Sequence, residues 1–313
     1  MAALYRFITF FWCLILSVSL SAHPGHAQDL SRIEGRDVAV LCESTLVPAA
    51  REVIAHYSTL KEELEATFLW EVDFRPVVVL IGQRGAFQQM SGHRSFVAYA
   101  VPNKRLIVVD YTRMNEAPFT LEVTLKHELC HLLLHRYMEK TELPKWLDEG
   151  IAQWISGGIP EIVTPRRPSM ITQAAFAGNL PPLESLVRSF PMDDQRLALA
   201  YEQSRSMVEY IIDNYGKNGI LNILETMRQG EGYREAILFS LAIPYPELEN
   251  RWRQDQQSFT AILSYFVLNL YTIIFVMAAL LTFFIYIRLL IRKKRLREEA
   301  EDEELTPQGP WAS

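Results

Sequence analysis

The pattern of apolar and polar positions changes character at about Asp110. Before it, short runs either alternate with a period of two or are rich in β-branched residues, as is typical of strands. The predicted strands cover residues 37–42, 75–82, 95–101 and 104–111. The run 75–82 is almost wholly apolar, which predicts a buried strand, and the last two runs flank Pro102-Asn103, which predicts a hairpin. One helix, residues 47–68, is predicted among these strands.

After Asp110 the apolar residues recur at helical spacing. The predicted helices cover residues 119–136, 145–156, 194–215, 218–229, 232–242 and 246–257. Residues 157–182 contain Pro and Gly and are predicted to be a loop region. The sequence therefore predicts an α+β domain, with a small mixed sheet in its N-terminal part and a helical C-terminal half.

Two apolar segments flank this domain. Residues 1–27 carry Arg6, then an apolar run and small residues, which is the layout of a secretory signal peptide, with cleavage after Ala22 or Ala27. Residues 261–287 contain no charge and are long enough to cross ~30 Å of hydrocarbon.

A basic cluster, Arg288 to Arg297, follows this apolar span and predicts that the tail, residues 288–313, is cytoplasmic. The main domain, residues 28–254, is then expected outside the cytoplasm, which in a bacterium is the periplasmic face of the inner membrane.

Composition adds two limits to this picture. The 313 residues carry a net charge of −6, so nothing indicates a nucleic-acid partner. Only Cys42 and Cys130 remain after the predicted signal peptide. An exported domain permits a disulfide, but Cys130 lies inside a predicted helix, and we expect no bridge between the two.

The stretch LKHELCHLLLH, residues 125–135, holds three histidines four residues apart. With 3.6 residues per turn, His131 lies about 40° from His127 around the helix, and Glu128, about 100° from His127, lies on the flank of the face that the two histidines share. Two such imidazoles can bind one ion at ~2.0–2.1 Å. His135 lies ~12 Å along the axis from His127, too far to join the same site, and is expected to face the carbonyl groups of the helix C-terminus.

The pattern HExxH, from His127 to His131, requires a third protein ligand and one open position. The metzincin pattern is excluded, because Leu134 and Tyr137 stand where it needs glycine and histidine. A carboxylate on a later helix remains, and the stretch LPKWLDEGIAQW offers Asp148 and Glu149.

HELCH followed by WLDEGIA resembles the gluzincin zinc metallopeptidases of the peptidase MA-like group, over roughly residues 75–253. The resemblance implies a Zn²⁺ cofactor held by His127, His131 and Glu149, because the glutamate before the glycine is the ligand in that family. It also implies that Glu128 is the general acid–base residue. Tyr201, in a Tyr-x-Gln-Ser stretch, is the predicted oxyanion donor.

Tyr210 and Tyr215 compete with Tyr201 for this role. Related aminopeptidases also carry a GxMEN-type motif on the edge strand that binds extended substrate. Residues 96–101 contain no acid, which favours internal cleavage of a peptide or protein substrate. The alternatives are an inactive peptidase-like module that binds a peptide or a membrane protein, and a zinc hydrolase of a non-peptide bond.

Overall fold

The computed structural model describes residues 30–114, 119–157, 170–257 and 270–304. The predicted signal peptide and residues 261–269 of the predicted membrane span lie outside these ranges. The chain divides into two compact units, one ending at Gln254 and the other beginning at Asp255.

A five-stranded mixed sheet occupies the N-terminal part of the first unit, as expected. Its strands are β1 (Leu30–Glu34), β2 (Ala39–Glu43), β3 (Val77–Ile81), β4 (Ala98–Val101) and β5 (Leu106–Asp110), in the order β1-β2-β3-β5-β4. The central strands β2, β3 and β5 are parallel, and both outer strands pair antiparallel. The predicted hairpin is therefore confirmed, and it places β4 at an edge of the sheet.

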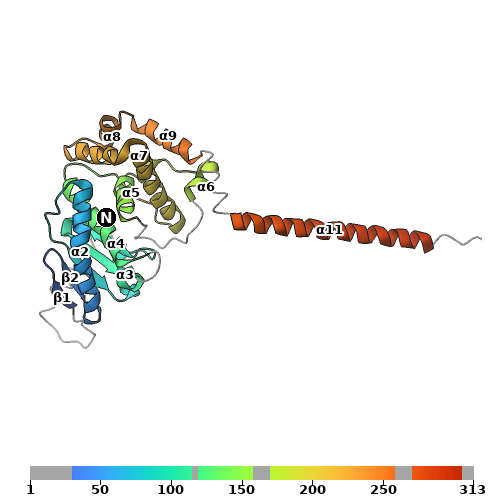
Figure 1. Cartoon of the computed structure of the whole chain (residues 1–313), viewed down its shortest axis with the longest axis horizontal. Coiled ribbons are helices and arrows are strands. Elements are labelled where there is room, and N and C mark those ends of the chain that lie inside the picture. The colour runs from blue at the N-terminus through green and yellow to red at the C-terminus, as the bar shows by residue number, and fades with distance from the viewer. Residues whose placement is uncertain (1–29, 115–118, 158–169, 258–269, 305–313) are drawn as a thin grey trace, which may run out of the picture. The chain divides into compact units, whose positions relative to one another are not determined.

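Two helices, α2 (Val47–Phe68) and α4 (Leu121–Tyr137), pack beside each other against this sheet (Figure 1). The register of the parallel strands places three buried residues side by side across the sheet: Val40 of β2, Val78 of β3 and Ile107 of β5. The alternate residues of β3 are only half-buried, so the strand predicted to be wholly buried is fully covered on one side alone.

The helical half follows α4, as predicted. Its helices are α5 (Lys145–Ser156), α6 (Met170–Phe176), α7 (Asp194–Arg228), α8 (Tyr233–Leu241) and α9 (Tyr245–Gln256). The two helices predicted over 194–215 and 218–229 form α7, which is interrupted at Gly216 with φ of 73°. Glycine adopts this left-handed conformation without the steric cost of a Cβ atom, which explains the break at this position.

Two short α-helices and one strand of the described part were not predicted. Residues 157–182 contain α6 and are therefore not loop throughout the described part. The other two are β1 and α3 (Arg84–Ser91). β1 has no buried residue and α3 has one, Phe87, so neither shows the apolar repeat on which a sequence prediction depends.

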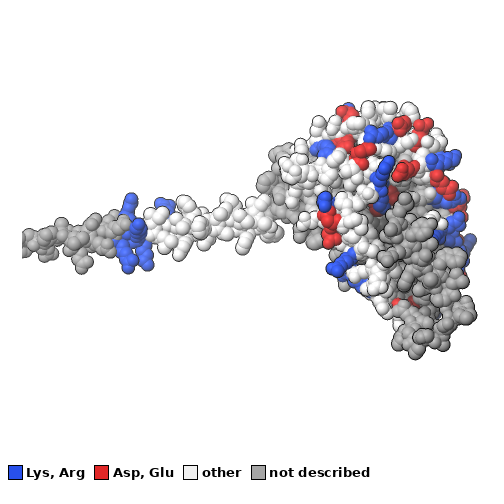
Figure 2. Space-filling model, turned by 180° about the vertical axis from the view of Figure 1, so that it is seen from behind, with Lys and Arg blue, Asp and Glu red and all other residues white. Residues whose placement is uncertain are grey.

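The second unit contains α11 (Leu270–Glu304). Its part Leu270–Arg297 is long and apolar enough to cross a membrane. Figure 2 shows the uncharged stretch of this helix followed by a cluster of Lys and Arg side chains. By length and composition, this helix supports single-pass anchoring.

Gly150 allows α5 and α7 to approach each other closely. A Cβ atom at this position would lie 2.3 Å from the backbone oxygen of Ser204 and 2.6 Å from a methyl group of Val208. Backbone oxygen cannot move aside as a flexible side chain does, so any larger residue must separate the two helices.

Replacement of Gly150 by alanine is therefore expected to lower the free energy of unfolding by about 1–3 kcal/mol through overpacking. Thermal unfolding followed by circular dichroism measures the loss. Gly85→Ala is the matched control, because Gly85 is also helical but has no atom within 4 Å of the added methyl group. Equal stability of the two variants would contradict the close approach.

Candidate metal centre

Helix α4 presents the HExxH residues from a buried position. Thr120 caps its N-terminus by accepting a hydrogen bond from the Val123 amide at 3.2 Å. His127 and Glu128 are fully buried and His131 is 4% exposed. Leucines on the remaining sides of the helix are buried as well, so α4 is covered both by the apolar core and by the neighbouring helix.

Helix α5 brings the carboxylates to α4. It begins after Pro144, which stands at the N-cap, and ends before Gly157 in the left-handed conformation. Asp148 and Glu149 lie in its first turns and are 3% and 0% exposed. The burial of two adjacent acidic residues requires compensating partners.

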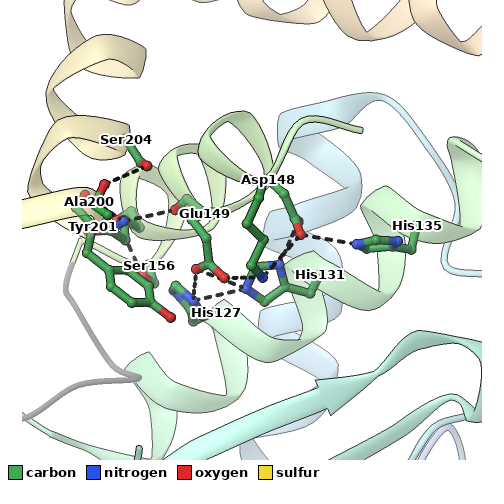
Figure 3. Close-up of polar contacts among 11 residues, drawn as sticks. His127, His131, His135, Asp148, Glu149, Ser156, Ala200, Tyr201 and Ser204 are labelled. Carbon is green, nitrogen blue, oxygen red and sulfur yellow. Dashed lines mark hydrogen bonds and ion pairs between the residues drawn. The ribbon is translucent and has the colours of Figure 1, made fainter. Parts of the chain in front are cut away.

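His127, His131 and Glu149 come together at one point, where their ligand atoms all lie within 4.8 Å of one another. The two histidine Nε2 atoms are 3.1 Å apart, and Glu149 Oε2 lies 3.5 Å from that of His127 and 3.6 Å from that of His131 (Figure 3). Ligands at ~2.0–2.1 Å from a tetrahedral ion are separated by ~3.3 Å. These three residues therefore fit a single metal ion.

The two oxygens of Glu149 face different partners. Oε2 faces the histidines, whereas Oε1 lies 2.5 Å from the Lys145 Nζ atom, one turn earlier on α5. Burial alone would raise the pKa of Glu149, but Lys145 and then His131 hold it well below its usual value. Glu149 is therefore ionised, as a metal ligand must be.

Asp148 was not assigned a role from the sequence, yet it contacts a member of this group. Its Oδ1 atom lies 2.6 Å from His131 Nδ1, and its Oδ2 atom lies 3.1 Å from His135 Nε2 (Figure 3). Burial would lower the pKa of His131, but Asp148 and Glu149 raise it well above its usual value. The sequence signal for Asp148 was its place next to Glu149, the predicted ligand, on a predicted helix.

His135 stands apart from the three grouped side chains. Its side chain is 42% exposed and contacts Asp148, not the carbonyl groups expected at the end of α4. The reason is the position of helix α5, because its Asp148 contacts side chains from two successive turns of α4.

Tyr201 extends from α7 toward His127 in Figure 3. It is 2% exposed, packs edge-on against Phe190 and belongs to a small apolar cluster with Leu197 and Ala198. Its carbonyl accepts a hydrogen bond from Gln153 of α5 at 3.1 Å, which ties α7 to the helix that carries Glu149.

Helix geometry separates the two competing tyrosines from Tyr201. Tyr210 is nine residues later and points to the opposite side of α7, about 180° around the axis. Tyr215 is on a similar side but ~21 Å further along. Neither can share the position that Tyr201 has near His127.

The edge strand β4 lies against α4. Just before it, Ser95 donates a hydrogen bond to Asp194 at 2.9 Å, which joins the sheet to the first turn of α7. The edge strand and the histidine helix are thus adjacent.

In the comparison with known proteins, a family match covers the central region of the chain. No curated protein matches it. The model of the peptidase MA superfamily matches residues 88–258, more than half of the chain, and this match includes β4, all of α4 and α5, and the helical half. The chain belongs to the peptidase MA superfamily.

Proposed function

We propose that this protein is a membrane-tethered zinc metallopeptidase of the gluzincin type that hydrolyses internal peptide bonds outside the cytoplasm. The observation that carries the proposal is the buried group of His127, His131 and Glu149, with separations that suit one tetrahedral ion. Two histidines and one carboxylate are the ligand set of a catalytic zinc site, because they leave the fourth position of a tetrahedral ion open.

The chemistry that a Zn²⁺ ion would supply here is that of a Lewis acid, which polarises a peptide carbonyl and lowers the pKa of water toward ~7. Glu128 is the general base and acid: it takes the proton of the attacking water and passes it to the leaving amine. Its place directly after His127 on α4, outside the group of His127, His131 and Glu149, supports this role.

Tyr201 is proposed to donate a hydrogen bond to the oxyanion that forms at the scissile carbonyl. Extended substrate would pair with the outer edge of β4, where main-chain groups supply affinity without dependence on sequence. The absence of an acidic residue from 96–101 leaves no partner there for a substrate amino terminus, which favours an endopeptidase.

Metal analysis of the purified full-length protein in detergent, paired with cleavage of a peptide library, tests the proposal. We expect about one zinc per chain and internal cleavage that stops when a chelator removes the metal and returns with added Zn²⁺. A protein without bound metal would overturn the proposal. A zinc protein that cleaves nothing would favour the peptidase-like binding module.

The proposed orientation predicts the result of limited proteolysis. Because the basic cluster after the apolar span favours the cytoplasmic side, protease added outside intact spheroplasts should degrade the domain. The span and its C-terminal tail should stay protected, as an antibody against the tail would show. A protected domain would reverse the orientation.

A further inference from the structure

We propose that His135 is a positioning residue for the metal ligand His131 and acts through Asp148. The inference rests on the proposed metal site and concerns two residues outside the ligand set, Asp148 and His135. Asp148 uses one oxygen for each histidine, with Oδ1 at 2.6 Å from His131 Nδ1 and Oδ2 at 3.1 Å from His135 Nε2.

The direction of these hydrogen bonds follows from the carboxylate, which accepts and does not donate. His131 must therefore carry a proton on Nδ1, and when it is neutral its Nε2 atom presents a lone pair. That Nε2 atom is the one that faces His127 and Glu149. Asp148 thus selects the tautomer of His131 that can bind a metal and holds the plane of the ring.

His135 holds Asp148 in this orientation. It lies four residues after His131 on α4, so the two imidazoles stand one above the other, with the carboxylate from α5 between them. Lys145 Nζ also lies near Oδ2, at 3.8 Å, but this ammonium is closer to Glu149. Loss of the His135 N–H would leave Oδ2 with the weaker partner and permit the carboxylate to rotate away from His131.

Because His135 is exposed, a loss of zinc affinity on its replacement would not be explained by lost core packing. Its side chain is 42% exposed and is absent from the buried core, so its replacement should not unfold the domain. His56 on α2 provides a matched control, because it is 41% exposed and lies 3.9 Å from one carboxylate, that of Glu52.

The test compares His135→Leu, His135→Gln and His56→Leu in the full-length protein. Zinc affinity is measured by competition with a chelator, and the visible spectrum of Co²⁺-loaded protein reports the geometry of the ligands. His135→Leu is expected to weaken zinc binding by 10–100-fold and to change the Co²⁺ spectrum. His135→Gln keeps an N–H donor near the position of Nε2 and should restore most of the affinity, and His56→Leu should match the wild type.

A double-mutant cycle tests whether His135 acts through Asp148. In an Asp148→Asn background the carboxylate is gone, so His135→Leu should cost much less affinity than it does in the wild type. Wild-type affinity and spectrum in His135→Leu would overturn the inference while leaving the metal site intact, and so would the same loss in both backgrounds. Absence of zinc from the wild-type protein would overturn the proposed function and this inference together.

Discussion

Replacement of Glu128 by glutamine is expected to lower turnover by ~10²–10⁴ and to leave metal content unchanged. Glutamine has nearly the shape of glutamate but cannot take a proton from water at neutral pH. Glu128 is outside the group of His127, His131 and Glu149, so its replacement removes no metal ligand. The two effects are therefore separable in one variant.

The fold should survive this change. Glu128 is fully buried, and a neutral amide costs less to bury than a carboxylate, so the thermal midpoint should stay close to that of the wild type. The measurement pairs zinc content with the rate of cleavage of a peptide selected from a library. Full zinc with collapsed turnover supports the assignment of Glu128.

Two other outcomes would leave that assignment without support. Unchanged turnover in Glu128→Gln would show that a contaminating peptidase cuts the substrate. Loss of zinc together with activity would make Glu128 part of the support for the metal and leave the general base unidentified.

Replacement of Glu149 by alanine is expected to have the second large effect, a loss of zinc affinity that exceeds the 10–100-fold typical of residues that only support a ligand. The change removes the single carboxylate of the proposed ligand set. It also removes the carboxylate that lies 2.5 Å from the Lys145 ammonium, so this positive charge would no longer be balanced by Glu149 and would disfavour a nearby cation.

Chelator competition measures this loss, and circular dichroism shows whether the domain is still folded. Glu142→Ala is the control: it removes an exposed acidic residue shortly before the same helix and should keep wild-type affinity. If Glu149→Ala retained zinc while His135→Ala lost it, the assignment of the third ligand to Glu149 would be wrong.

The sequence by itself determined the features that depend on local geometry. The ends of α2 and α5 match their predicted ranges, because each helix carries a long apolar repeat and is bounded by proline, glycine or a change in pattern. The common side of His127 and His131 follows from the 3.6-residue turn alone. The short elements β1 and α3 escaped prediction, because they bury too few side chains to produce a repeat.

The tertiary structure decided what depends on the packing of one helix against another. Residue spacing identified two acidic candidates on α5, and a family resemblance was needed to choose Glu149. The 3.5 Å distance between Glu149 Oε2 and His127 Nε2 depends on how α5 lies across α4. The same crossing places Asp148 between His131 and His135. Gly150 sets how closely α7 approaches, and no periodicity within one segment specifies that contact, since it arises from atoms 54 residues apart in the chain.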